Sequence, residues 1–286
     1  MKRSKRKLTA AFCTITLLLM ALVSGCGNGA ASTKEGTEGL TYEPYEGSYV
    51  VTGYSGSEVD VVVPDTYNDI PVVKVGREVF YNSDIQSIVL GRNVQEIGSD
   101  VFDGASMLKS ITITSEGINM GKIGSCKSLE EIRFSTDAYA TYIRLEECGT
   151  IASVALPDGL QEISISNCEN LSSVQLPNTV VTISDMANCP KLTSIDLPDS
   201  LTEIGSHAFK NSTSISELVI PASVTSVGSD AFYGFGSDQK IVITGSTDSW
   251  DDYRKELWGE ENTVPNVIMT GYWAGNCNAQ IEYENG

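Results

Sequence analysis

Ile85-Gln86-Ser87-Ile88-Val89-Leu90 is one copy of a six-residue pattern that returns along most of the chain. The pattern has Leu or Ile, two variable residues, an aliphatic residue, one variable residue and a final Leu, Ile or Phe. Its later copies begin, 20 to 23 residues apart, at Leu108, Leu129, Ile151, Leu171, Leu192 and Ile215. Weaker copies at Val59 and Lys240 extend the series to about nine units. A fixed period of this length indicates a repeat architecture.

Each copy has the alternation of a short strand that buries one face. In the first copy, Ile88 and Leu90 occupy the apolar positions of this alternation. A second apolar step follows most copies, as in Val94-Gln-Glu-Ile97, and predicts another short strand. A single unit cannot bury its apolar face alone, so successive units must stack around a continuous core. We therefore expect residues 47–245 to form a mainly β repeat solenoid.

Several units close with a glycine followed three residues later by Val or Ala and then Phe. We interpret the glycine as permitting a turn, and the phenylalanine as entering the core from a single helical turn. The four segments with this ending are Val75-GREVF, Ile97-GSDVF, Ile204-GSHAF and Val227-GSDAF.

These endings, together with the strand pattern, resemble the BspA-like family of bacterial leucine-rich repeats, whose consensus is approximately L-x-x-I-x-I-P-x-x-V-x-x-I-G-x-x-A-F-x-x-C. The opening segment of residues 64–80 also looks like the first repeat of that family. The resemblance covers residues 49–245 and implies a surface-exposed recognition role, commonly adhesion to other cells or host proteins. The chain departs from the consensus in its middle, where the units that begin at Leu108, Leu129, Ile151 and Leu171 lack the Gly-x-x-Ala-Phe step.

The first 25 residues have the composition of a lipoprotein signal peptide. Five basic residues within residues 2–7 precede an apolar run from Leu8 to Val23. The ending Val23-Ser24-Gly25-Cys26 resembles the bacterial lipobox, which implies that Cys26 is lipidated and becomes the new N-terminus. The alternative is an uncleaved membrane anchor, because the run is close to the lower limit of about 17 residues for a spanning helix. Either way, we expect the rest of the chain outside the cytoplasm, anchored to the membrane at the extracellular face of the envelope.

The segments that flank the repeats have other compositions. Residues 26–46 are rich in Gly, Ser, Thr and Glu, which predicts a flexible tether after Cys26. The period ends after Ile243, and residues 246–286 are expected to cap the open end of the solenoid. Residues 244–262, which lead into this cap, contain a predicted amphipathic helix, and residues 267–270 predict a last strand. The helix's aromatic side chains could alternatively serve as a platform for a ligand; they are Trp250, Tyr253 and Trp258.

The charge of the chain excludes some classes of partner. The chain has 19 basic and 37 acidic residues. Five of the basic residues lie in the signal, so 14 remain and the net charge of the mature form is −23. Repulsion from phosphates argues against nucleic acid and against an anionic membrane surface as partners.

Four cysteines recur with the repeat, 20 to 22 residues apart: Cys126, Cys148, Cys168 and Cys189. Each lies three residues before the Leu or Ile that opens the next unit, and other units hold Asn82, Ala105 or Ser212 at the place we align with it. A small buried residue is the favoured interpretation. Disulfides and a metal site are the alternatives, although a linear row does not suit the tetrahedral arrangement of a closed zinc site. No role is predicted for Cys277.

The sequence gives little support for catalysis. The single histidine, His207, occupies a variable position of the turn, where matching units hold Glu78, Asp100 and Asp230. Acid–base or nucleophilic catalysis through an imidazole would depend on this one residue. A carboxylate pair remains open in a chain with 37 acidic residues, without a motif to support it. We therefore expect a non-enzymatic protein that needs no cofactor.

The outward positions of the stacked strands are the expected binding surface. The position between the two core residues of each strand is apolar at both ends of the series and polar in the middle. We predict contacts from Glu131, Arg133, Gln175 and Asp196, with Tyr139 and Tyr142 nearby, since aromatic residues are enriched in interfaces. The alternative is that these side chains form only a solvated face. The expected partner is an extracellular protein or glycan, or else a component of the organism's own envelope.

Overall fold

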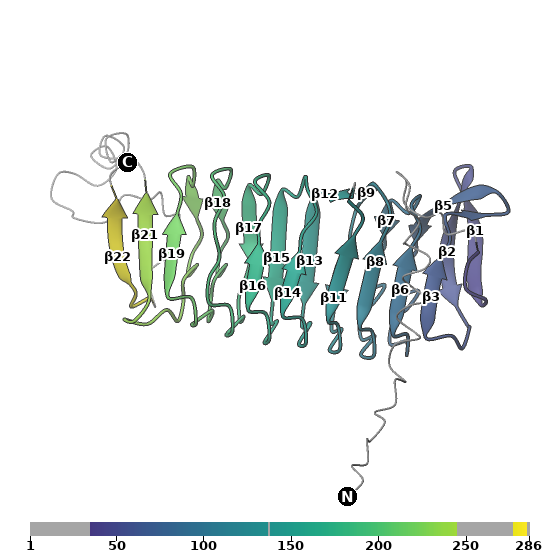
Figure 1. Cartoon of the computed structure of the whole chain (residues 1–286), viewed down its shortest axis with the longest axis horizontal. Coiled ribbons are helices and arrows are strands. Elements are labelled where there is room, and N and C mark those ends of the chain that lie inside the picture. The colour runs from purple at the N-terminus through teal and green to yellow at the C-terminus, as the bar shows by residue number, and fades with distance from the viewer. Residues whose placement is uncertain (1–34, 137, 245–276, 285–286) are drawn as a thin grey trace, which may run out of the picture.

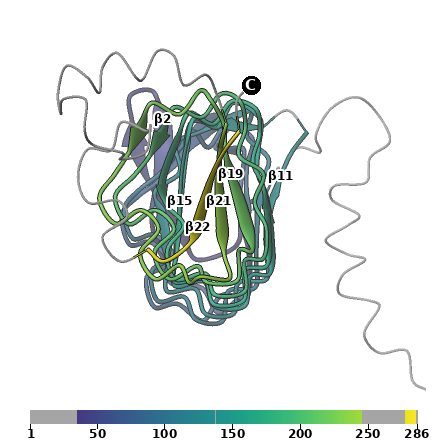
Figure 2. The same ribbon diagram turned by 90° about the vertical axis from the view of Figure 1, so that its left-hand side faces the viewer.

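The computed structural model describes residues 35–136, 138–244 and 277–284, which form a β-solenoid of about nine coils (Figure 1). The predicted signal, the lipidation site at Cys26, and the helix and strand expected in the C-terminal cap lie outside the described residues. The coils superpose around one closed cross-section when the solenoid is viewed along its length (Figure 2). Among the described residues no helix is long and apolar enough to cross a bilayer.

One long side of the solenoid, here called the first face, carries the strands predicted from the six-residue pattern. Residues 280–284, which lie in the segment expected to cap the solenoid, add a further parallel strand that the sequence did not predict. The strands of this face pair in parallel with their neighbours in three groups, β3-β6-β8-β11, β14-β16 and β19-β21-β22. The strands are β3 (Asp60–Val63), β6 (Ser87–Leu90), β8 (Ser110–Ile113), β11 (Glu131–Phe134), β14 (Ser153–Ala155), β16 (Ser173–Gln175), β19 (Glu217–Ile220), β21 (Lys240–Thr244) and β22 (Gln280–Glu284). The copy at Leu192 is the exception: Leu192 and Ile195 are buried, but residues 191–197 form no strand.

The opposite side, here called the second face, carries the short strands predicted from the second apolar step and, in the first and central coils, further strands that no such step predicted. They are β2 (Ser48–Tyr54), β5 (Ile70–Val75), β7 (Glu96–Ile97), β10 (Lys122–Gly124), β13 (Tyr142–Glu146), β15 (Glu162–Ser166), β17 (Thr182–Asp185), β18 (Glu203–Ile204) and β20 (Ser226–Val227). The strands in the middle are longer because those units lack the Gly-x-x-Ala-Phe turn and continue as strand. Two short strands, β9 (Gly117–Ile118) and β12 (Tyr139–Ala140), pair with each other between the two faces.

The N-terminal end is closed by two hairpins. Strand β1 (Leu40–Tyr45) pairs antiparallel with β2, and β4 (Thr66–Tyr67) pairs antiparallel with β5. Strand β1 begins inside the predicted tether of residues 26–46, so that prediction is wrong for the part of the segment from Leu40 onward. The polar composition of this segment gave no indication of a strand. In the structure the Tyr42 ring of β1 stacks on the Tyr67 ring, with 4.0 Å between ring centroids. Burial of Tyr42 raises its pKa to about 12.

A single hydrophobic core runs from Val51 to Ile243. The predicted phenylalanines are fully buried within it. Phe80 stacks on Phe102 with 6.0 Å between ring centroids, and Phe209 stacks on Phe232 at 5.9 Å. In the central coils, aliphatic side chains such as Ile123, Leu145 and Ile165 are buried in the same core.

The phenylalanine segments are turns and not the single helical turns expected from the sequence. The residue two positions before each phenylalanine has a positive φ, between 53° and 60°, at Glu78, Asp100, His207 and Asp230. A left-handed residue interrupts a right-handed helix. The neighbouring backbone N–H groups instead donate to the next coil, as Phe80 does to the carbonyl of Val101.

The glycine of the same motif has a different role from the one predicted. None of these glycines has a positive φ in the structure. Each instead lies against the backbone of the preceding coil: a Cβ at Gly205 would lie 2.7 Å from the Ser184 carbonyl oxygen, and one at Gly228 would lie 2.3 Å from the Ser206 nitrogen. The glycines therefore set how closely adjacent coils can stack.

Candidate functional site

Four of the predicted binding residues lie on the first face with their side chains exposed. Glu131 and Arg133 project from β11 and form an ion pair with 2.6 Å between Oε1 and Nη2. Strand β14 lies beside β11, and the row continues along the solenoid through exposed Ala155, Gln175 and Asp196. Serines occupy the neighbouring outward row in several of these coils, so this part of the first face is open and rich in hydrogen-bonding groups.

The two predicted tyrosines do not join this surface as a pair. Tyr139 lies on β12, at the edge between the faces, and is 53% exposed. Tyr142 begins β13 on the second face, because the chain turns between β11 and β13. Burial is the main cause of the raised pKa of Tyr142, and Arg144 beside it opposes that shift. Tyr142 is therefore not available to a ligand on the first face.

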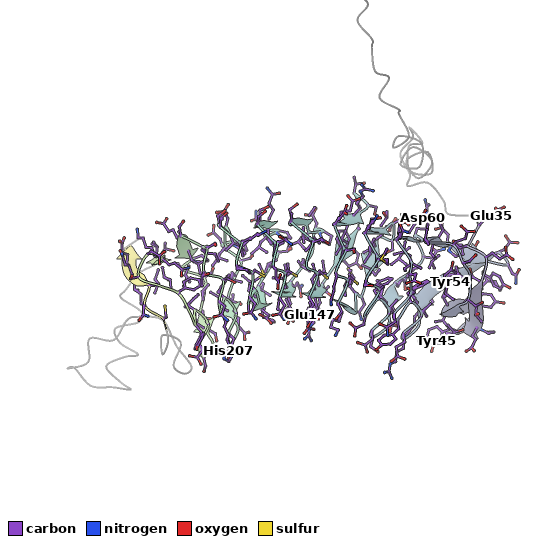
Figure 3. The ribbon with its side chains drawn as sticks, turned by 90° about the horizontal axis from the view of Figure 1, so that it is seen from below. Glu35, Tyr45, Tyr54, Asp60, Glu147 and His207 are labelled. Carbon is purple, nitrogen blue, oxygen red and sulfur yellow. The ribbon has the colours of Figure 1, made fainter. Side chains whose placement is uncertain are left out.

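The opposite edge of the solenoid, where each coil passes from the second face to the next first-face strand, carries a row of left-handed residues. We call this row the left-handed ridge. All its members have φ between 50° and 87°: Asn82, Gly104, Ser125, Glu147, Asn167, Asn188, Asn211 and Gly234. Glu147 lies on the same margin of the molecule as His207, across from Asp60 of the first face (Figure 3). Asparagine tolerates this backbone conformation better than most residues do.

In the structure Asn82 does not occupy the position of the repeating cysteines, where its spacing in the sequence had placed it. Its N–H donates to the Asp103 carbonyl, just as the N–H of Asn211 donates to that of Tyr233. Asn82 therefore belongs to the ridge, one residue before the position of the cysteines. The recurrence of Asn directly before Cys, at Asn167 and Asn188, is the signal in the sequence that could have revealed the ridge.

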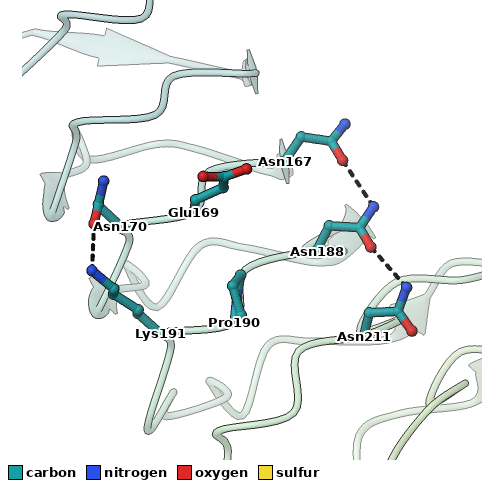
Figure 4. A pocket seen from close by; sticks show the side chains of 7 residues that line it. All are labelled: Asn167, Glu169, Asn170, Asn188, Pro190, Lys191 and Asn211. Carbon is teal, nitrogen blue, oxygen red and sulfur yellow. Dashed lines mark hydrogen bonds between the residues drawn. The ribbon is translucent and has the colours of Figure 1, made fainter.

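Two open pockets lie on the ridge. The larger, of about 440 Å³, is lined by Asn167, Asn170, Asn188, Pro190, Lys191 and Asn211, together with Glu169 (Figure 4). The second, of about 380 Å³, lies nearer the N-terminus, around Tyr81, Asp103 and Lys127. Neither pocket could be predicted from the sequence, because the residues that line each one come from three or more coils and are far apart along the chain.

The four repeating cysteines are fully buried free thiols in the described structure. Three of them donate to a carbonyl of the preceding coil, as Cys126 does to Phe102 with 3.2 Å between Sγ and O. Ser212 does the same with the Met186 carbonyl at 2.7 Å, which confirms that it shares the position. The neighbouring thiol and burial raise the pKa of Cys148 to about 12, and burial raises that of Cys189 to about 12. At neutral pH the thiols of Cys148 and Cys189 are therefore uncharged and poor nucleophiles.

His207 lies at the surface with its side chain half exposed, 3.8 Å from an Asp230 carboxylate oxygen. Both residues are the left-handed residue two positions before a phenylalanine, and they lie beside each other because their coils are adjacent. Within the described ranges, no group of three or more His, Cys, Asp or Glu side chains is placed to hold a metal ion.

A family model described as the BspA type leucine rich repeat region matches this chain in six copies, over residues 73–187 and 144–254. The chain belongs to the BspA-type leucine-rich-repeat family. Proteins of this family and fold are typically binding scaffolds without enzymatic activity. The aliphatic and phenylalanine positions of the BspA-type repeat are the ones whose side chains form the buried core.

Three solved structures are similar to this BspA-type chain. A leucine-rich repeat protein from Bacteroides ovatus is 22% identical, with a TM-score of 0.49, and the match covers 86% of this chain and 70% of that one. A leucine-rich repeat protein of T. pallidum is 21% identical, with a TM-score of 0.37 and coverage of 84% and 98%. A leucine-rich cell surface protein from Faecalibacterium prausnitzii is 18% identical, with a TM-score of 0.32 and coverage of 90% and 97%. No curated protein matches the chain.

Proposed function

We propose that this protein is a lipid-anchored, non-enzymatic recognition protein on the outer side of the cell envelope, and that its first face binds an extracellular protein or glycan. The observation that carries the proposal is the exposed polar strip formed by the Glu131–Arg133 ion pair, Gln175 and Asp196. These side chains project from a rigid stack of coils, so a ligand need not order the backbone on binding. Membership in the BspA-type family supports the same role.

Binding, and not catalysis, is the activity that this arrangement favours. The single imidazole of the chain, His207, is exposed on a coil edge beside one carboxylate. The raised pKa values of Cys148 and Cys189 hold these two buried thiols in their neutral form, so they do not suit nucleophilic chemistry. A flat, open strip lacks the enclosure that lets a catalytic site exclude water.

The recognition proposal is tested by a binding screen with the mature chain from Gly27, secreted without its lipid. Extracellular proteins, glycans and an envelope extract of the producing cell serve as probes. A double change, Arg133→Ala with Asp196→Ala, is expected to weaken the best saturable interaction at least tenfold, because both side chains lie in the proposed contact strip. Biolayer interferometry gives the dissociation constants.

A charge-matched control is Arg77→Ala with Asp84→Ala, which changes two exposed residues away from the first-face strip. Equal weakening by both double variants, or no saturable binding to any probe, contradicts the proposal. Binding only to the cell's own envelope extract supports the alternative of a structural envelope lipoprotein.

The lipid anchor at Cys26 is tested separately. Cells that express the full chain are fed an alkyne-bearing fatty acid, and the purified protein is examined for the label. We expect label on the wild-type chain and none on Cys26→Ser, because the lipobox cysteine is the only proposed acceptor. An unlabelled wild-type chain that stays in the membrane would favour the uncleaved anchor.

A further inference from the structure

The larger pocket on the left-handed ridge is a groove between two rows of side chains. One row is a ladder of amides: Asn188 Nδ2 donates to Asn167 Oδ1 at 2.8 Å, and Asn211 Nδ2 donates to Asn188 Oδ1 at 2.9 Å. The other row joins Lys191 to Asn170, with 2.6 Å between Nζ and Oδ1. Pro190 lies between the rows (Figure 4). The groove therefore runs along the solenoid, across three successive coils.

The side chains of the groove are fixed before any ligand arrives. Asn170 donates to the Gly149 carbonyl while it accepts from Lys191. Asn188 is held on both sides within its ladder, which uses one of its two N–H groups and one lone pair of its carbonyl oxygen. An asparagine side chain offers two donors and two acceptor positions, so one of each remains for a ligand. Groups fixed in this way lose little entropy when they bind.

The charge of the groove differs from that of the protein as a whole. The chain has 37 acidic and 19 basic residues, yet the lining of this groove has one of each, Glu169 and Lys191, and is otherwise uncharged. The groove is thus neutral on a protein that repels anions. A cationic ligand would find stronger attraction elsewhere on the surface, and a neutral ligand rich in hydrogen-bonding groups suits this lining best.

From these features we propose that the groove binds a linear, uncharged oligosaccharide, at a second site that is separate from the first-face strip and goes beyond the proposed function. Each sugar hydroxyl both donates and accepts hydrogen bonds, as does each amide of the ladder. The ring of Pro190 and the aliphatic stem of Lys191 supply carbon surface for the C–H faces of the sugar rings. Coils stack about 4.8 Å apart, so the amides repeat along the groove at a spacing suited to a chain of similar units.

A peptide is the less suitable occupant. Peptide and protein ligands derive most of their affinity from a few large side chains buried in well-packed pockets. In this groove Pro190 is the single apolar residue of the lining, and it lies at the surface. The groove therefore offers a peptide hydrogen bonds without an anchor.

The test uses the mature chain from Gly27 and isothermal titration with hexasaccharides of glucose, mannose and N-acetylglucosamine, with hexagalacturonate as the charged probe. The diagnostic change is Asn188→Gly combined with Asn170→Ala. Glycine keeps the left-handed backbone of the ridge, where Gly104 and Gly234 already occur, and removes only the amide. The matched control is Asn82→Gly, at the same ridge position in a coil outside the groove.

We expect at least one neutral hexasaccharide to bind saturably. Its dissociation constant should rise at least tenfold in the Asn170/Asn188 variant and stay unchanged in Asn82→Gly. Equal losses in both variants, no loss in either, or tighter binding of hexagalacturonate would overturn the proposal. If no saccharide binds while a protein probe still binds through Arg133 and Asp196, the groove proposal fails and the recognition function stands. If no probe of any kind binds, both fail.

Discussion

Replacing Phe102 by alanine is expected to lower the free energy of unfolding by about 3–5 kcal/mol. The ring is fully buried and stacks on Phe80 of the preceding coil. Its removal leaves a cavity between two coils whose backbones are held together by hydrogen bonds, so the neighbouring side chains can fill it only in part. Urea unfolding followed by circular dichroism measures the change. Because domains of this kind have about 5–15 kcal/mol of stability in total, the loss is large.

Tyr81→Ala is the matched control for this prediction. Tyr81 belongs to the same turn as Phe80, but half of its side chain is exposed. Its truncation is expected to change the unfolding free energy by about 0.5 kcal/mol or less, as is usual for surface positions. A loss in Phe102→Ala no larger than that in Tyr81→Ala would mean that the phenylalanine stack does not hold the coils together.

A single methyl group added at Gly228 is expected to cost about 3 kcal/mol, the upper end of the range for overpacking. A Cβ there would meet the Ser206 nitrogen at 2.3 Å and the Gly205 carbonyl carbon at 2.7 Å. Both atoms are backbone, so no side chain can rotate to relieve the contact. The two coils would have to move apart, which weakens the parallel pairing of β18 with β20. Thermal and urea unfolding of Gly228→Ala measure the effect.

Gly149→Ala supplies the comparison. The nearest atom to a Cβ at this position is the Lys127 carbonyl oxygen, at 3.9 Å, which is ordinary van der Waals contact. Alanine also restricts the unfolded chain, so this variant is expected to gain up to about 1 kcal/mol. Similar destabilisation by both alanines would show that loss of glycine itself, and not contact between coils, causes the effect at Gly228.

The proposed surfaces follow from the geometry of one coil. The first-face strip takes its side chains from the outward positions of the first face in successive coils. The groove takes its amides from the ridge, at the edge where each coil joins the next. Since the core fixes both rows, substitutions such as Arg133→Ala and Asn188→Gly are expected to change binding without unfolding the solenoid.

The amino-acid sequence by itself determined the repeat, its period and the residues of the core. The alternation of Ile88 with Leu90 is local information, and it correctly predicts which side of each strand is buried. The same holds for Phe80 and Phe102, whose burial follows from their recurrence. The family resemblance rested on these positions and is confirmed by the family match. The exposure of Arg133 and Asp196 also follows from the alternation.

Only the tertiary structure decided what depends on distances between coils. The close approach at Gly228, the position of Asn82 on the ridge and the amide ladder through Asn188 all join residues more than 20 positions apart. Tyr142 lies only a few residues beyond β11, yet the path of the chain carries it to the other face. Strand β1 formed where composition predicted a tether, because Tyr42 finds partners in a later hairpin. Alternation along the sequence specifies burial one residue at a time, whereas a groove or a contact between backbones exists only once the coils are stacked.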